Sequence, residues 1–258
     1  MWRKRRCGFA PSSPPALSYV GRLLFLGLAL TLVAMACGGE TTLLSGREIV
    51  SAIPWSGPET FRYRLLQGDE LKGSGELHLE RDGDTLLLTQ RFEFPEEGLS
   101  DDVSAVVDPA TLRPLEVRRV IDGPEGERAC RADYDGSMVT VEQEAKDDAR
   151  TDRFAVPARS YDSWSDLFLW RALAFSEDYQ AKYSDILSCT LTKPQVVSVV
   201  LKVKGIEAVS VPAGTFDAWR LEIRSGGRTQ KAWYADDSAR TLVRYDNGDL
   251  VFELESRE

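Results

Sequence analysis

Few residues of this sequence have types and spacings suited to catalysis. His78 is the only histidine among the 258 residues, so a Ser-His-Asp triad and a histidine-rich zinc site are both excluded. It lies between Leu77 and Leu79 on the polar side of an alternating segment, which indicates a surface position. No serine is convincingly paired with a lysine base. We therefore predict a protein that is not an enzyme and that needs no metal or other cofactor.

Acidic residues occur in pairs that could hold a metal ion. The pairs are Asp101-Asp102, Asp147-Asp148 and Asp236-Asp237. A partial calcium loop also begins at Asp133, but its sixth position, which must be glycine, is Met138. Solvated turns account better for both features, because aspartate favours turn conformations.

One cysteine has the surroundings of a modification site. Ala34-Met35-Ala36-Cys37 resembles a lipoprotein box, in which the cysteine thiol takes a diacylglycerol and the chain is cut just before it. A basic head at residues 3–6 and an apolar run from Leu23 to Ala36 precede the cysteine, as in an export signal. The run has 14 residues, whereas spanning a bilayer takes roughly 20.

We therefore predict a lipoprotein signal peptide at residues 1–36 and a lipid on Cys37. The lipid would anchor the protein to the cell membrane or the outer membrane, facing the periplasm or the cell exterior. A secretory signal without lipidation is the alternative interpretation. Residues 37–58 would then form a tether, which ends in the turn-rich sequence Pro54-Trp55-Ser56-Gly57-Pro58.

The exported part keeps two further cysteines, Cys130 and Cys189. Outside the cytoplasm an even pair usually forms a disulfide, which we predict here, with two buried thiols as the alternative. Removal of five basic residues with the signal leaves 27 basic against 41 acidic residues, a net charge near −14. Such a chain repels phosphate backbones, so no nucleic-acid partner is expected.

Alternation of apolar and polar residues dominates the chain from residue 59 onward and is typical of half-buried strands. Hairpin-turn signals, such as Asp82-Gly83, Asp135-Gly136 and Asn247-Gly248, separate the alternating segments. We predict an antiparallel meander that the polar run from Glu144 to Arg153 interrupts.

A single convincing helix is predicted at Ser160 to Phe175. Ser163-x-x-Asp166 resembles a capping box at its beginning. Its apolar face is wide, so the helix must be covered over most of its circumference. Large aromatic residues on this helix and on late strands either fill a core or line a lipid-sized hollow; they are Trp164, Phe168, Trp170, Trp219 and Trp233.

Several turn sequences resemble those of a known family. They are Val211-Pro212-Ala213-Gly214-Thr215-Phe216-Asp217-Ala218, Trp233-Tyr234-Ala235-Asp236-Asp237, Val243-Arg244 and, earlier, Val107-Asp108-Pro109-Ala110-Thr111-Leu112-Arg113-Pro114. The sequence is similar, over about residues 60–254, to bacterial envelope proteins catalogued as a domain of unknown function. That resemblance implies the curved sheet of the lipoprotein-carrier superfamily, the LolA/LolB type, in which an unclosed barrel leaves an apolar hollow.

We therefore expect a mainly β domain at residues 59–258, a half-barrel with one central helix in its concavity. The expected function is that of a lipid-anchored envelope protein that binds an apolar ligand, a lipid or an acyl chain. The alternative is a non-enzymatic assembly or interaction protein, with an envelope protein as partner, whose own side chains fill the hollow.

Overall fold

The computed structural model describes residues 44–45, 48–146 and 148–258. Cys37, the predicted signal peptide and the first part of the predicted tether lie outside the described residues. Within the described part of the chain, no helix combines the length and the apolar character needed to cross a membrane.

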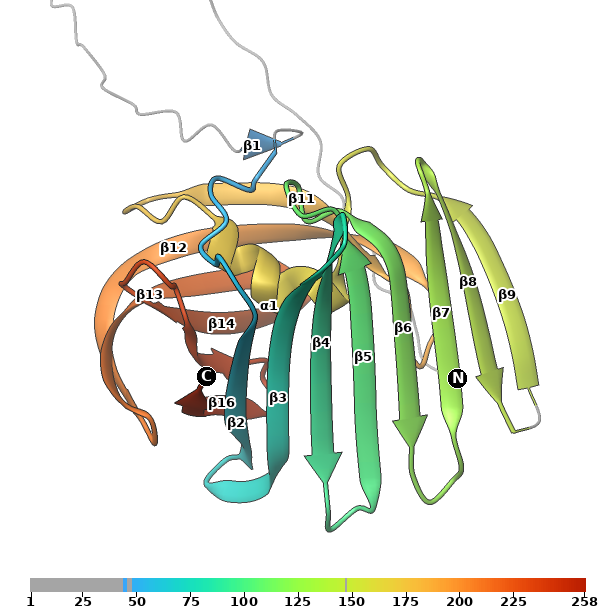
Figure 1. The fold of residues 1–258 in the computed structure, drawn as a ribbon, viewed down its shortest axis with the longest axis horizontal. Helices are drawn as coiled ribbons and strands as arrows, with labels where there is room; N and C mark the ends of the chain where they lie inside the picture. The colour runs from blue at the N-terminus through green and yellow to red at the C-terminus, as the bar shows by residue number, and fades with distance from the viewer. Residues whose placement is uncertain (1–43, 46–47, 147) are drawn as a thin grey trace, which may run out of the picture. The chain divides into compact units, whose positions relative to one another are not determined.

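The strands form two antiparallel runs that are each continuous along the chain (Figure 1). The first run consists of β2 (Glu59–Gln67), β3 (Glu70–Asp82), β4 (Thr85–Phe94), β5 (Leu99–Val107), β6 (Pro114–Asp122), β7 (Arg128–Asp135), β8 (Met138–Ala145) and β9 (Asp148–Ala155). The second run consists of β11 (Gln180–Leu187), β12 (Gln195–Val211), β13 (Gly214–Ser225), β14 (Arg228–Ala235), β15 (Leu242–Asp246) and β16 (Val251–Arg257). Two short strands, β1 (Leu44–Ser45) and β10 (Tyr161–Asp162), pair in parallel with β11.

The last strand joins the two runs into one sheet. β16 pairs with β2 in antiparallel register, with Leu254 opposite Tyr63. The backbones of Thr60 and Glu258 exchange two hydrogen bonds of 3.0 and 2.9 Å. The sheet order therefore runs from β11 through β16 and β2 to β9. This confirms the predicted single, curved, antiparallel sheet with a helical segment packed against it.

The prediction that the meander stops at residues 144–153 is wrong. β8 and β9 pair along their whole length, from Met138 opposite Ala155 to Ala145 opposite Asp148. β9 is an edge strand, and most of its side chains are exposed. An edge strand with little to bury needs no apolar alternation, and its charges discourage pairing with another chain.

The helical segment is shorter than the predicted Ser160 to Phe175. It comprises a 3₁₀ turn η1 (Ser163–Ser165), the helix α1 (Asp166–Leu169) and a second 3₁₀ turn η2 (Trp170–Ala172). The N-cap is Asp162, whose side chain accepts a hydrogen bond from the Trp164 amide at 2.9 Å, and not the predicted Ser163. The wide apolar face is covered because all four residues of α1 are buried.

The main core lies between the concave face of the sheet and this helical segment. Alternate residues of β2 point inward, and Phe61, Tyr63 and Leu65 are all buried. Both runs bond to the helical backbone, because Gln90 donates to the Trp164 carbonyl and the Tyr234 hydroxyl donates to the Leu167 carbonyl. A smaller apolar cluster, on other strand positions, consists of Val209, Ala218, Trp233, Ala235 and Val243.

The end of the predicted tether packs on the domain. Ile49 is 2% exposed and belongs to the main core. The Ser51 amide donates a hydrogen bond to the Ala172 carbonyl at the end of the helical segment, at 2.7 Å. Residues 48–52 therefore fix the chain to the domain before β2 begins.

Candidate functional site

A cavity of about 290 Å³ lies between the helical segment and the sheet. Both runs of strands contribute to its walls, which are largely apolar. The aromatic and aliphatic lining residues include Phe92, Phe94, Trp164, Leu167, Trp170, Ile223, Tyr245 and Phe252. Three aromatic rings of this lining pack edge to face, with centroid distances of 5.5 Å for Phe92–Phe252 and 5.3 Å for Tyr245–Phe252.

The cavity reaches from the hairpin ends of the sheet into the buried interior. Five of its partly exposed lining residues stand at or beside strand ends and turns; they are Phe94, Ser225, Gln230, Asn247 and Leu250. Its deepest lining residues include Trp170 and Asp185, which are each 1% exposed. A chain-like ligand could therefore enter between the hairpins and lie against the helical segment.

The structure places the five predicted aromatic residues in four different environments. Trp164 and Trp170 line the cavity. Phe168, 1% exposed, is part of the main core but not of the cavity lining. Trp219 packs against Phe175 at a centroid distance of 6.2 Å and donates to Asp236.

Trp233 belongs to the smaller apolar cluster, away from the cavity. Its neighbour Tyr234 points into the main core. Successive strand residues point to opposite faces, so Trp233 faces the other way. Its indole N–H donates to Glu207 at 2.6 Å, and the Arg244 guanidinium lies 5.6 Å from its ring centroid.

Sequence reasoning missed the buried carboxyl groups beside the cavity. Asp162, Asp166 and Asp185 are all buried, and the last two line the cavity. Asp185 occupies an inward position of β11 between Tyr183 and Leu187. A charged residue inside an otherwise apolar alternation was the signal that could have revealed it.

Two of these three carboxyl groups accept hydrogen bonds from tyrosine side chains on other elements. The Tyr134 hydroxyl and the Trp164 amide donate to Asp162. The Tyr183 hydroxyl donates to Asp166 at 2.8 Å and accepts from the Trp170 indole at 2.8 Å. Among the described residues, the Oδ1 atom of Asp185 has no hydrogen-bond partner.

Burial shifts the protonation of all three groups. It raises the pKa of Asp162 to about 6, although the nearby Ser188 hydroxyl and the hydrogen bonds from Tyr134 and the Trp164 amide oppose the shift. Burial, followed by the charges of neighbouring aspartates, raises the pKa of Asp185 well above its usual range. The pKa of Asp166 is raised in the same way, while its hydrogen bond from Tyr183 lowers it.

We expect the free energy of unfolding to increase as the pH falls from about 7 to about 5. Between the unfolded and folded pKa values, the folded protein holds protons that the unfolded chain has lost, so stability falls as the pH rises through this window. For Asp162, a pKa of about 6 against the usual 3.8 corresponds to roughly 3 kcal/mol over the whole window.

The trend should reverse below about pH 4, because hydrogen bonds from Thr111 and Arg118 lower the pKa values of Asp108 and Glu116. Urea unfolding at a series of pH values measures the curve. Asp162→Asn keeps an acceptor for the Trp164 amide and should flatten the acidic side. A wild-type stability that rises steadily from pH 5 to pH 8 would contradict the assignment.

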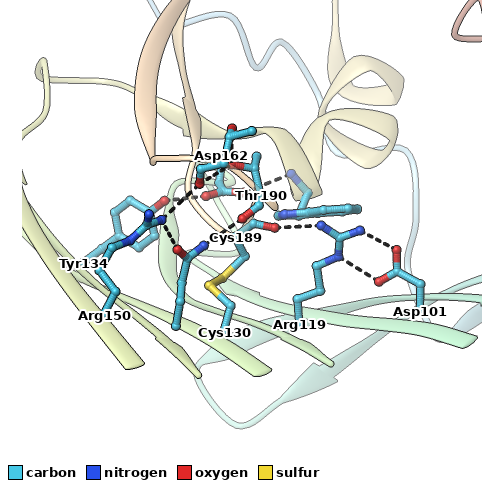
Figure 2. Close-up of a disulfide and its surroundings, with 11 residues drawn as sticks. Asp101, Arg119, Cys130, Tyr134, Arg150, Asp162, Cys189 and Thr190 are labelled. Carbon is cyan, nitrogen blue, oxygen red and sulfur yellow. Dashed lines mark hydrogen bonds and ion pairs between the residues drawn. A yellow bond between two sulfur atoms is a disulfide. The ribbon is translucent and has the colours of Figure 1, made fainter. Parts of the chain in front are cut away.

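The predicted disulfide between Cys130 and Cys189 is formed, with a Cα–Cα distance of 5.6 Å. Cys130 is on β7, near one end of the sheet order, and Cys189 follows β11, near the other end. Side chains from the β7 end also donate to backbone carbonyls after β11 (Figure 2): Arg119 to Cys189 at 2.9 Å, Gln143 to Thr190 at 2.7 Å and Arg150 to Thr192 at 3.2 Å. We call the disulfide and these three hydrogen bonds the clasp.

The clasp also contacts the cavity wall. Arg119 forms two hydrogen bonds with Asp101, of 2.8 and 2.6 Å (Figure 2). Its guanidinium carbon lies 4.5 Å from the ring centroid of Trp164. Because Asp101 and Trp164 both line the cavity, Arg119 connects the clasp to the position of that wall.

A solved structure shares this architecture. A β-barrel-like protein of the domain of unknown function DUF1849, from Brucella abortus, aligns with a TM-score of 0.51 at 14% identity, covering 81% of this chain and 98% of that one. A Bacteroides fragilis protein with a YmcC-like fold aligns at 13% identity with a TM-score of only 0.26, covering 81% of this chain and 99% of that one. No curated protein matches the sequence. At such identities the first likeness shows the fold alone.

The sequence itself carries the family assignment. The model of a family described as "Protein of unknown function (DUF3108)" matches residues 63–255, from β2 to β16. The match spans both runs of strands, the helical segment and both cysteines of the clasp. The chain therefore belongs to the DUF3108 family.

Proposed function

We propose that this protein is a lipid-anchored protein of the cell envelope that binds an apolar ligand, a lipid or an acyl chain. The observation that supports this proposal best is the 290 Å³ cavity with aromatic walls. Ligand pockets usually have volumes of about 300–1,000 Å³, so this one suits a single chain better than a whole phospholipid. A similarity to the LolA/LolB-type lipoprotein-carrier superfamily is part of the proposal.

The supporting chemistry is that of binding rather than catalysis. The aromatic walls offer a large apolar area to a chain, and the net charge disfavours nucleic acids. In the alternative, a protein that acts in envelope assembly, its own side chains would fill the hollow of the sheet and its surface would bind a protein partner.

Saturable binding of an uncharged apolar probe tests the proposal. We expect N-phenyl-1-naphthylamine to gain fluorescence on the purified, solvent-extracted protein. Ser225 lies at the partly exposed end of the cavity, so Ser225→Phe should block entry and weaken binding by about tenfold, or about 1.4 kcal/mol. Thr229→Phe is the matched control, because Thr229 is exposed on the adjacent strand and does not line the cavity.

Two results would favour the assembly alternative. One is no saturable fluorescence change with wild-type protein. The other is equal binding by wild type and both variants, which would place the probe elsewhere on the surface.

The anchor gives a separate prediction. Cys37→Ser removes the thiol that would carry the lipid, so the variant should leave the membrane fraction and lose the mass of the lipid. Mass spectrometry and fractionation of cells expressing wild type and variant measure both effects. Cys7→Ser is the control, because Cys7 lies within the predicted signal peptide. A Cys37→Ser protein that keeps the wild-type mass and stays in the membrane would contradict lipidation.

A further inference from the structure

The ionisable side chains that line the cavity, apart from tyrosine, are all acidic. Its described lining residues include three acidic side chains, Asp101, Asp166 and Asp185, and no lysine, arginine or histidine. Arg119 neutralises Asp101 through two hydrogen bonds. Asp166 and Asp185 have no such cationic partner among the described residues, so any charge that these two groups take on at the deep end of the cavity is negative.

One carboxyl oxygen of Asp185 lacks a hydrogen-bond donor among the described residues. Only 1% of Asp185 is exposed, and its Oδ1 atom has no hydrogen-bond partner among the described residues. A buried acceptor left without a donor is destabilising, and most buried polar groups in proteins are paired. A ligand that brings a donor into the cavity would supply what the chain itself does not.

Resting on the proposed function, we infer that the apolar ligand carries a protonated amine at its polar end, which binds Asp185 and Asp166 while the chain lies against the aromatic walls. Ammonium groups donate up to three hydrogen bonds and carry the opposite charge. A carboxylate, by contrast, would bring a negative charge into a poorly solvated place beside two acidic groups, and it would oppose the ionisation of both.

One further polar atom of the lining lacks a partner, the indole Nε1 of Trp164. It is a donor and could donate a hydrogen bond to a carboxylate ligand. It is uncharged, however, and a single neutral donor does not offset the repulsion from two buried carboxyl groups. The balance of the site therefore favours the cation.

The release or uptake of protons by Asp185 and Asp166 when a ligand binds should show the sign of the ligand's charge. Asp185 is faced by Asp166 from α1 and Asp162 from β10. Three tyrosines also face it, Tyr183 on its own strand, Tyr134 on β7 and Tyr245 on β15. The acidic groups repel one another when ionised, so the empty site keeps protons. An ammonium ligand would release such a proton to solvent as it binds, whereas a carboxylate would draw one in.

The test compares three ten-carbon ligands that differ only in their polar end: decylamine, 1-decanol and decanoate. Each displaces the naphthylamine probe at about pH 7.5 from wild-type protein. We expect decylamine to bind about tenfold more tightly than 1-decanol, and decanoate to bind least. Decanoate binding as tightly as decylamine would overturn the inference and leave the proposed function intact. Failure of all three ligands and of the probe would overturn both.

Substitutions test whether Asp185 and Asp166 cause the preference for decylamine. Asp185→Asn should weaken decylamine binding about tenfold and change 1-decanol binding by less than about twofold. Asp166→Asn, which can still accept from Tyr183, gives the same readout if Asp185→Asn does not fold. Asp249→Asn removes an equal charge from an exposed residue outside the cavity. An equal loss in this control would assign the amine preference to the acidic surface and overturn the inference.

The direction of the pH dependence provides an independent readout. Decylamine stays protonated between about pH 5 and pH 8, as lysine does. Its affinity should therefore increase with pH, because protons compete with the ammonium group for the raised-pKa carboxyl groups of Asp185 and Asp166. Calorimetry in buffers of different ionisation enthalpy should record proton release. Affinity that is constant or falls with rising pH would overturn the assignment to these two residues.

Discussion

Replacing Cys130 and Cys189 together with alanine is expected to lower the free energy of unfolding by about 4 kcal/mol. The disulfide joins residues 59 positions apart, so it restricts a long loop in the unfolded chain. A typical domain has a total stability of about 5–15 kcal/mol, and a loss of this size would remove a large part of it. Alanine is preferred to serine because Cys189 is 1% exposed and a buried hydroxyl would add its own cost.

Urea unfolding of wild type, with and without reductant, and of the double variant measures this loss. The stability of the double variant should not change with reductant, because it has no disulfide to reduce. It therefore controls for other effects of the reductant on the wild-type protein. A loss below about 1 kcal/mol would show that the three hydrogen bonds of the clasp hold the sheet ends together without the disulfide. Two titratable thiols, besides Cys37, in denatured and unreduced wild-type protein would contradict the bond itself.

Phe168→Ala is expected to destabilise the domain by about 3–5 kcal/mol, as truncations of large buried aromatic residues do. Phe168 is 1% exposed within the main core and lies outside the cavity lining, so its removal leaves a void that its neighbours cannot easily fill. Phe168→Leu keeps most of the side-chain volume, so it should destabilise the domain less than Phe168→Ala does. The difference between the two variants separates the cost of an empty space in the core from the loss of the ring's own contacts.

Trp164→Ala is the informative comparison, because Trp164 is only partly buried and lines the cavity. Its removal should cost less stability than that of Phe168 and weaken probe binding more. Unfolding curves and probe titrations on both variants provide the two measurements. A Trp164→Ala variant that loses stability like Phe168→Ala but keeps its probe affinity would assign Trp164 to the core alone.

The strands and their turns could be predicted from local patterns because one face of the sheet is buried. Period-two alternation and turn pairs such as Asp82-Gly83 reflect that burial directly. β9 escaped prediction for the same reason, since an edge strand that buries little shows no alternation. The helical segment was predicted too long because apolar spacing indicates burial and not helix. Residues 173–175 are apolar but lie beyond the end of the helical segment, where Leu173 is already extended.

The site depends on pairings that no local pattern records. The join of β16 to β2 connects residues about 190 positions apart and decides which side chains meet in the concavity. Trp219 and Trp233 were expected to line the same hollow as Trp164, because all three are large and apolar. Successive side chains of a strand point to opposite faces, however, and Trp233 lies on the face away from the cavity. Asp185 and Asp166 meet the cavity from β11 and α1, and their proximity requires the parallel pairing of β10 with β11.

The join of β16 to β2 also has a consequence for the order in which the chain can fold. The ribosome makes β2 to β9 first, and until residues 251–257 emerge, β2 has an unpaired edge in what becomes the middle of the sheet. Contacts between distant parts of a sequence form slowly, and an open strand edge can pair with other chains meanwhile. The nascent chain therefore carries its greatest risk of aggregation until synthesis of its last strand, and a chaperone that covers β2 would reduce that risk.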